Sequence, residues 1–399
     1  MVFRGCIPGG RVEYEILKPP PRRRRAWLVV VVVVVVAVSA GAFVAGRRSG
    51  STTRSASSTT TTTTPAVAAR PLSLVSTVPA NGASDVPSDQ VVSFTLSAPV
   101  ASATGLPLFD PPVPGTWRRR GARTLVFSAA APFIPTTTET MTFPAGTDGV
   151  RSASGGVLAA PATVTFTVAQ ASTERLQQLL AEGGYLPVSF TPAGPTPAPA
   201  EAATAQAGTF AWRWPGLPSA ITSVWTEGAE NPLTRGALMS FQRQNGLQVD
   251  AVAGRQVWTA LLADAAGGKT DGEPYVAVLV SKVVPETLTL YRNGVPVLAD
   301  IPVNTGAPGA DTADGTFPVF EHVVSSRMAG TNPDGSTYDD PAVPWASFFN
   351  GGDALHGFVR ASYGTPQSNG CVEMPIAVAA QVWPLTPIGT PVTVIGPPS

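Results

Sequence analysis

The chain has 399 residues, more than one ordinary domain contains, and this length allows two to four domains. Its 26 Lys plus Arg balance its 26 Asp plus Glu, so no global field attracts nucleic acid, and we expect no nucleic-acid partner. The 39 Gly and 41 Pro, together with only 13% charged residues, indicate many turns and short strands. This composition favours a multidomain, mainly β chain.

An uncharged apolar segment covers residues 26–46. A helix rises about 1.5 Å per residue, so a segment of this length spans the roughly 30 Å hydrocarbon core of a membrane. Four arginines precede the segment and two follow it, which predicts a cytoplasmic basic tail over residues 1–25. The small residues at positions 38–40 leave a cleaved signal peptide open. We expect a single-pass anchor in the cell membrane, with the C-terminal domains outside and facing the cell wall.

Residues 47–70 are rich in Ser and Thr and nearly free of large apolar side chains, which predicts an unstructured linker. The chain has two cysteines, Cys6 and Cys371. The predicted anchor places them on opposite sides of the membrane, so they cannot form a disulfide with each other. An unpaired thiol outside the cell suggests either a reactive residue or intermolecular pairing.

Short β-rich runs separated by turn clusters fill residues 71–169 and predict a small β-sandwich. The opening stretch VSTVPANGASDVPSDQVVSFTLSAPV resembles bacterial Ig-like domains. The basic cluster WRRRGAR, residues 117–123, is predicted to be a solvent-exposed hairpin rather than a binding site.

Three amphipathic helical patterns lie within residues 170–265, and a long insert rich in Ala, Pro and Thr separates the first from the second. The region resembles the three-helix type of peptidoglycan-binding domain, although Ala251 replaces the usual glycine and residues 188–230 lengthen the first loop. The matching residues are Leu176-Gln177, Gly184-Tyr185, Phe241-Gln242, Asp250 with Gly254, and Trp258 with Leu261. Most of these are typical core and turn residues.

The last predicted domain covers residues 274–397. It opens with strand-like alternation, and Asn293-Gly294 between two such runs is a strong hairpin signal. The polar stretch at residues 328–343 is long enough to predict a lid or binding loop. A short helix is expected to start at Pro375, followed by a closing strand.

His356 precedes Cys371 by fifteen residues in this domain. A free thiol has a pKa of about 8.5, so a cysteine nucleophile needs a nearby imidazole or a helix N-terminus to form thiolate. Gly370 permits a tight turn, and the amides from Asn369 to Cys371 offer an oxyanion hole. From the residues alone, a catalytic pair and a buried cysteine with a capping histidine both stay open. Two histidines without an acidic cluster make no convincing ligand set, so we expect neither a metal nor a cofactor.

The segment from residue 275 to 395 resembles the catalytic domain of L,D-transpeptidases, the YkuD-like cysteine enzymes that cross-link peptidoglycan. The matching residues are Asn304-Thr305-Gly306, Gly315-Thr316-Phe317, Trp345, Phe349-Asn350-Gly351, His356-Gly357, and Ser368 with Gly370-Cys371. The resemblance implies a mixed, β-rich catalytic fold and assigns roles to individual residues. These roles are Cys371 as nucleophile, His356 as its base, Gly357 as the carbonyl that orients the ring, Asn369 and Gly370 at the oxyanion, and Tyr338 and Ser368 as substrate contacts.

The resemblance also implies a reaction. A tetrapeptide donor stem loses D-Ala to form a thioester on Cys371, and the diaminopimelate amine of an acceptor stem resolves it into a 3→3 cross-link. Carbapenem-type inhibitors would acylate the same thiol. Two positions depart from the family pattern: Asn369 stands where a histidine is usual, and Glu373 where Arg or Asn is common.

Two alternatives remain. One is a wall-binding scaffold with a degenerate catalytic domain, which Asn369 suggests. The other is a cysteine peptidase of the wall, although its usual order of Cys before His is absent here. The remaining histidine, His322, belongs to no motif that pairs it with an acidic or cysteine partner and is predicted to be structural.

Overall fold

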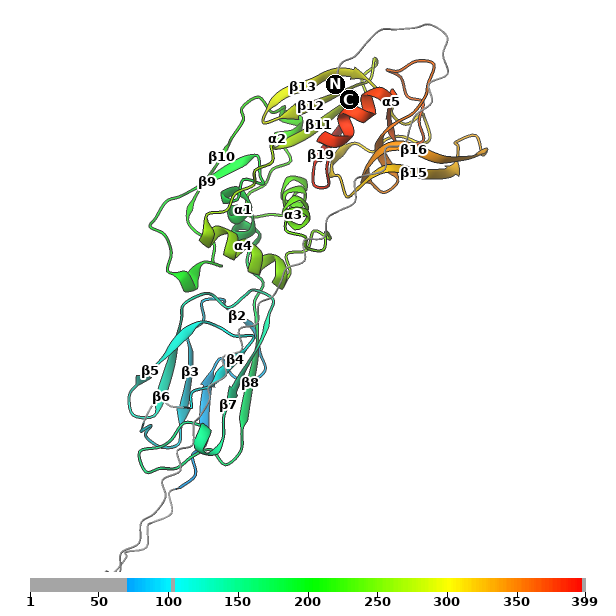
Figure 1. The fold of residues 1–399 in the computed structure, drawn as a ribbon. Coiled ribbons are helices and arrows are strands. Elements are labelled where there is room, and N and C mark those ends of the chain that lie inside the picture. The colour runs from blue at the N-terminus through cyan, green and yellow to red at the C-terminus, as the bar shows by residue number, and fades with distance from the viewer. Residues whose placement is uncertain (1–69, 102–104, 397–399) are drawn as a thin grey trace, which may run out of the picture. The chain divides into compact units, whose positions relative to one another are not determined.

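The computed structural model describes residues 70–101 and 105–396, and their arrangement is mainly β and multidomain, as predicted (Figure 1). The predicted basic tail and membrane anchor, with the linker up to residue 69, lie outside the described residues. Within those residues, no helix combines the length and the apolar character needed to cross a membrane.

The first domain is a sandwich of two four-stranded sheets, with strand orders β1-β3-β6-β5 and β2-β8-β7-β4. Along β3, Val92, Phe94 and Leu96 are buried and the residues between them are less so, because alternate side chains of a strand point to opposite faces. Both sheets contribute to one core. The elements are β1 Leu74–Val78, β2 Ala83–Val86, β3 Val92–Leu96, β4 Leu108–Asp110, β5 Gly115–Arg120, β6 Thr124–Ala129, β7 Thr138–Phe143, the 3-10 turn η1 Gly146–Asp148 and β8 Ala162–Val168.

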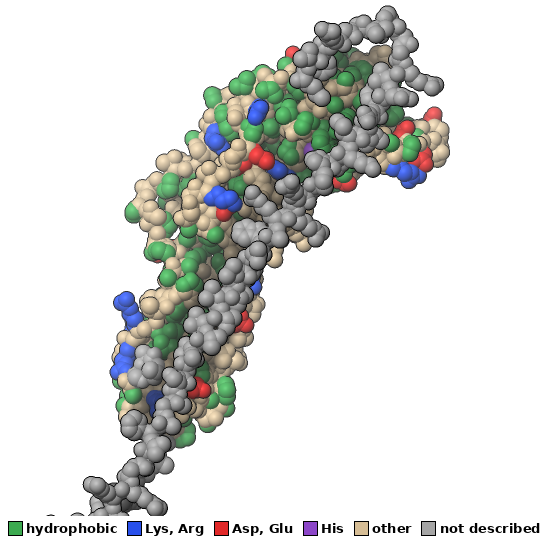
Figure 2. All heavy atoms as spheres, viewed as in Figure 1, with side chains coloured by type: hydrophobic (Ala, Val, Ile, Leu, Met, Phe, Trp, Pro, Cys, Tyr) green, Lys and Arg blue, Asp and Glu red, His purple; other side chains and the backbone are tan. Residues whose placement is uncertain are grey.

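The basic cluster forms the predicted hairpin, in which β5 pairs antiparallel with β6. Arg118, Arg119 and Arg120 are exposed, and Figure 2 shows basic side chains along the edge of the sandwich where these strands lie. The exposed arginines agree with a solvated strand.

The second domain has the three predicted helices and four further elements inside the insert. Asn231 caps α3 by accepting a hydrogen bond from the Thr234 amide at 3.0 Å, and Pro232 occupies the first helical position. The insert contains an antiparallel hairpin of β9 and β10 and a short helix, so it is more ordered than the sequence suggested. The elements are α1 Thr173–Glu182, β9 Val188–Pro192, η2 Pro199–Glu201, β10 Gly208–Trp212, α2 Ser219–Thr222, α3 Pro232–Gln244 and α4 Arg255–Gly267.

The third domain has two sheets, with strand orders β13-β12-β11-β19-β14 and β15-β16-β17-β18. A shared apolar core lies between them, and α5 packs against β17. The elements are β11 Val276–Ser281, β12 Thr287–Arg292, β13 Val295–Pro302, β14 Gly315–Pro318, β15 Glu321–Thr331, β16 Thr337–Asn350, β17 Asp353–Gly357, β18 Val372–Met374, α5 Ile376–Val382, η3 Trp383–Leu385 and β19 Pro391–Ile395.

The prediction of a long irregular loop at residues 328–343 is wrong. This stretch belongs to the β15–β16 hairpin, in which Thr331 pairs with Thr337 across a turn that contains Asp334 and Gly335. Asp and Gly are favoured turn residues. The hairpin end is largely exposed, so it lacks the alternation of buried and exposed side chains by which a strand is recognised in sequence.

The second and third domains pack closely through α3. A Cβ atom on Gly236 would lie 2.5 Å from the carbonyl oxygen of Gly389, so only glycine permits this approach. The Ser240 hydroxyl donates to the Ile388 carbonyl at 3.4 Å. Ala277 of β11 is buried in the core of the helical domain.

Candidate active site

The predicted pair comes together at the parallel strands β17 and β18. His356 lies on β17 opposite Glu373 of β18, and Cys371 directly precedes β18. Both His356 and Cys371 line one pocket of about 480 Å³. Tyr338 of the β15–β16 hairpin also lines this pocket. Asn369 lines it as well, so the tertiary structure groups four of the predicted site residues around one cavity.

His356 is 3% exposed, and its Nδ1 lies 3.2 Å from the carbonyl oxygen of Gly357. This carbonyl was the predicted orienting group. With Nδ1–H donating to it, Nε2 is the ring nitrogen that can accept a proton. Burial lowers the pKa of His356, which favours the neutral imidazole a base requires. A Cβ on Gly357 would lie 3.0 Å from Ile376 Cα, so the glycine lets α5 pack beside the histidine.

Cys371 is partly buried and contacts two backbone groups, the Gly352 carbonyl at 3.6 Å from Sγ and the Ala354 amide. Burial, helped by the nearby carboxylates of Asp353 and Glu373, raises the pKa of the Cys371 thiol to about 12. With this raised pKa, the Cys371 thiol is largely protonated at neutral pH.

The turn before Cys371 is stabilised by hydrogen bonds between its own residues. Gly370 has a φ of +108°, and a Cβ there would lie 2.5 Å from Asp353 Oδ1. The Ser368 hydroxyl donates to the Cys371 carbonyl at 2.6 Å and accepts from the Gly370 amide at 3.2 Å. Ser368 is 1% exposed and does not line the pocket. Ser368 therefore stabilises the turn, because both of its side-chain hydrogen bonds stay inside it, and its contact with substrate stays a prediction.

The hydrogen bonds of Ser368 also decide which of the predicted oxyanion donors is already occupied. The Gly370 amide is already used by Ser368, whereas no other residue in the described part of the chain bonds the amides of Asn369 and Cys371. The Asn369 side chain points to the hairpin, where its Nδ2 donates to Asn332 Oδ1 at 2.6 Å. Both Asn332 and Asn369 line the pocket.

The unusual Glu373 has a partner that the sequence did not reveal. Arg360 Nε and Nη2 each lie 2.7 Å from a Glu373 carboxylate oxygen, and both residues line the pocket. The Arg360 guanidinium also lies over the Phe358 ring, 4.8 Å from its centroid. The only signal in the sequence was the departure at Glu373, since a partner thirteen residues away carries no mark of its own.

The other histidine is engaged elsewhere. His322 stacks on Trp383 with 4.0 Å between ring centroids, and its Nε2 lies 2.8 Å from the Trp383 carbonyl oxygen. It does not line the pocket of Cys371. These contacts agree with the predicted structural role.

Three family models match the chain. Residues 68–168 match a bacterial Ig-like domain, residues 223–261 match a putative peptidoglycan binding domain, and residues 276–394 match the L,D-transpeptidase catalytic domain. The chain therefore carries an L,D-transpeptidase catalytic domain after an Ig-like domain and a peptidoglycan-binding domain. No curated protein sequence matches the chain.

Several solved structures are similar. An L,D-transpeptidase from Mycobacterium smegmatis is 13% identical, with a TM-score of 0.28, over 82% of this chain and 100% of that one. L,D-transpeptidase 3 from Mycobacterium tuberculosis, in complex with a faropenem-derived adduct, is 13% identical with a TM-score of 0.28, over 81% and 97%. The catalytic domain of the E. faecium L,D-transpeptidase is 24% identical with a TM-score of 0.28, over 31% and 100%.

Proposed function

We propose that this protein is a peptidoglycan L,D-transpeptidase that forms 3→3 cross-links through a thioester on Cys371. The observation that carries the proposal is that His356 and Cys371 line one pocket within a domain that matches the L,D-transpeptidase catalytic domain. The matched peptidoglycan-binding domain supports peptidoglycan as the substrate.

The first half of the reaction is acylation. His356 Nε2 takes the thiol proton as the sulfur attacks the carbonyl of diaminopimelate in a tetrapeptide stem. The carbon–sulfur bond forms, the amide bond to D-Ala breaks, and His356 returns the proton to the departing D-Ala amine. The amides of Asn369 and Cys371 are the donors that would stabilise the oxyanion.

The second half resolves the thioester. The side-chain amine of diaminopimelate on a second stem attacks the thioester carbonyl, an amide forms, and the carbon–sulfur bond breaks. The amine loses a proton and Cys371 regains one, so His356 carries a single proton between them. The resting pair is neutral, and this agrees with proton transfer during attack instead of a standing thiolate–imidazolium pair.

The site of action follows from the predicted anchor at residues 26–46, which would hold the matched domains outside the cell membrane and within reach of the wall. Topology is tested by protease or biotin labelling of intact cells. Labelling of the Ig-like domain only after lysis would contradict this placement.

A second candidate is a wall-binding scaffold with an inactive catalytic domain. The raised pKa of Cys371 favours it, because a protonated thiol is a poor nucleophile. If the protein is a scaffold, it and its Cys371→Ala variant should bind insoluble peptidoglycan equally well, and neither should produce 3→3 muropeptides.

The deciding experiment incubates the purified protein with a carbapenem and maps any adduct by peptide mass spectrometry. One drug mass on the Cys371 peptide, absent from Cys371→Ala, supports the transpeptidase. Incubation with tetrapeptide muropeptides then separates transfer from hydrolysis: dimers support transpeptidation, whereas shortened monomers alone indicate a peptidase. A protein that stays unmodified over hours, with muropeptides unchanged, would favour the scaffold.

A further inference from the structure

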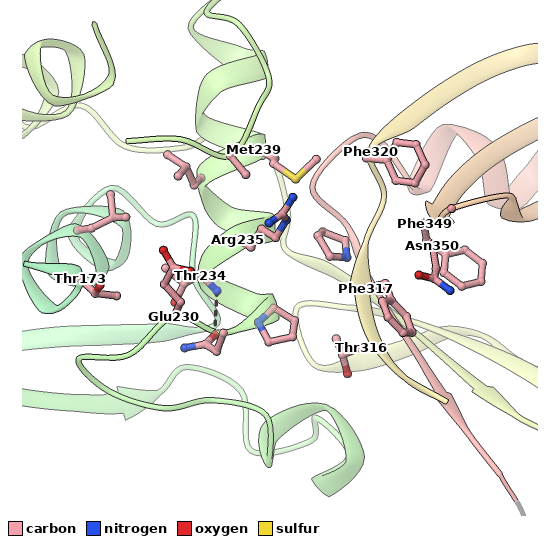
Figure 3. A pocket seen from close by; sticks show the side chains of 17 residues that line it. Thr173, Glu230, Thr234, Arg235, Met239, Thr316, Phe317, Phe320, Phe349 and Asn350 are labelled. Carbon is pink, nitrogen blue, oxygen red and sulfur yellow. Dashed lines mark hydrogen bonds between the residues drawn. The ribbon is translucent and has the colours of Figure 1, made fainter. Parts of the chain in front are cut away.

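A second pocket, of about 460 Å³, lies where the helical and catalytic domains meet (Figure 3). Thr173 of α1, with Thr234, Arg235 and Met239 of α3, lines one side. The other side is formed by residues of β14 and β16 and by the neighbouring Phe320. The volume falls in the range of pockets that hold small ligands.

This pocket and the pocket of Cys371 lie on two sides of one turn, the connection from β16 to β17. Asn350 and Gly351 line the second pocket, here called the junction pocket, whereas Gly352 and Asp353 line the pocket of Cys371, here called the catalytic pocket. Asn350 Nδ2 donates to Asp353 Oδ2 at 3.1 Å, which ties the two sides of the turn together. A ligand in the junction pocket therefore lies one short turn away from the carbonyl that contacts Cys371 Sγ.

The residues that line the junction pocket include aromatic rings and charged side chains to which no role has been assigned. Phe317, Phe320 and Phe349 belong to the catalytic side, and Phe320 is 41% exposed. On the helical side, Glu230 and Arg235 are exposed, and neither side chain forms an ion pair or hydrogen bond with any described residue. Figure 3 shows Arg235 directed between the helical residues and the phenylalanines.

We infer that the junction pocket binds an N-acetylated sugar of the wall glycan, and so presents the attached stem peptide to Cys371. Sugar rings have apolar faces that pack on aromatic side chains, and their hydroxyl and acetamido groups both donate and accept hydrogen bonds. Glu230 would accept from hydroxyls, and Arg235 would donate to a hydroxyl or acetamido oxygen. The inference rests on the proposed function, because it names the part of that substrate that this pocket holds.

The charges favour the sugar over the stem peptide as the occupant. One carboxylate and one guanidinium line the pocket, so their charges cancel, and an uncharged ligand can use both. A stem peptide carries free carboxylates, for which this pocket offers no net positive charge. The position of the pocket agrees with this assignment, since glycan on one side of the turn leaves the catalytic pocket open for the peptide.

The test measures binding of an N-acetylglucosamine tetramer to the purified protein by calorimetry. Arg235→Ala and Phe320→Ala alter exposed side chains of the pocket, and each is expected to weaken binding about tenfold or more. Arg292→Ala is the matched control, because Arg292 is exposed and lies outside both pockets. Carbapenem labelling of Cys371 should proceed equally in all four proteins, which reports on folding and on the catalytic pocket separately.

Binding that is lost in the two pocket variants and kept in Arg292→Ala supports the inference. Tetramer binding that is absent, or equal in every variant, overturns it. Tight binding of a sugar-free stem peptide that Arg235→Ala abolishes also overturns it in favour of a peptide site. Failure of carbapenem labelling with tetramer binding intact would refute the proposed function and leave the sugar site standing.

Discussion

Arg360 and Glu373 form a two-point ion pair at the wall of the catalytic pocket, with both nitrogen–oxygen distances at 2.7 Å. The Glu373 side chain is 6% exposed and that of Arg360 is 31% exposed. Burial of one partner sets this pair apart from the Arg327–Asp339 pair on the nearby hairpin, where both side chains are more than half exposed. The contrast allows a matched test.

We expect Arg360→Ala to lower the free energy of unfolding by about 2–4 kcal/mol, because it leaves a buried carboxylate without its partner. Arg327→Ala should change it by less than about 1 kcal/mol, since exposed pairs contribute little. Urea denaturation of both variants measures the difference. Equal effects would contradict the view that burial makes the Glu373 pair important.

His356→Ala and His322→Ala compare the only two histidines of the chain. Loss of the base should slow carbapenem acylation of Cys371 by about 100-fold or more. His322→Ala should leave the acylation rate within a few-fold of the original, while lowering stability through lost stacking on Trp383. Stopped-flow measurement of acylation provides the rates. Similar rates for the two variants would remove His356 from the mechanism.

The Cys371 thiol should react slowly with iodoacetamide at neutral pH. Its raised pKa of about 12 leaves far less thiolate than a free cysteine has, so we expect alkylation at pH 7 to be at least about 100-fold slower than for free cysteine. The rate should keep rising with pH beyond 9. Peptide mass spectrometry separates Cys371 from Cys6. Rapid alkylation that levels off below pH 8 would show a standing thiolate instead.

Glu139→Gln should stabilise the Ig-like domain at alkaline pH. Burial raises the pKa of Glu139 from 4.5 to about 7, with nearby Asp110 adding to the shift and Arg255 opposing it. A folded-state pKa above the unfolded value means that the protonated form stabilises the fold, and this contribution is lost as the pH rises from about 4.5 through 7.

At pH 8 the neutral glutamine should therefore raise the free energy of unfolding by roughly 1–2 kcal/mol, and at pH 4 it should change little. Thermal unfolding of both proteins across this pH range is the measurement. A gain at pH 4 equal to that at pH 8 would mean that the charge of Glu139 is not the cause.

Gly370→Ala should disrupt the turn before Cys371. The residue has a φ of +108°, and the new methyl group would lie 2.5 Å from Asp353 Oδ1. Gly246→Ala is the control, because Gly246 has a φ of +65° but nothing within 4 Å of the added atom. We expect roughly 1 kcal/mol of destabilisation in the control and clearly more in Gly370→Ala, with slower carbapenem acylation only in the latter. Equal acylation in both would show that the turn tolerates a side chain.

Much of the fold could be predicted from local pattern. The amphipathic patterns within residues 170–265 predicted the three helices, including α3, and Asn293-Gly294 predicted the β12–β13 hairpin, because such signals depend on residues close in the chain. The β15–β16 hairpin was mistaken for a loop, since its exposed end carries no periodic burial. The order within the long insert was missed for a similar reason.

The sequence by itself determined the chemical inventory: one thiol and two histidines beyond the predicted anchor, the glycine before Cys371, and the order of three domains. Only the tertiary structure decided which groups meet. It placed His356, and not His322, in the pocket of Cys371, and it directed the Ser368 side chain into the turn. It also paired Arg360 with Glu373 and formed a second pocket from residues more than 100 positions apart, such as Thr173 and Phe349. The physical reason is that residue type and spacing record local backbone preferences. Burial, pairing and pKa depend on which distant strands the fold brings together.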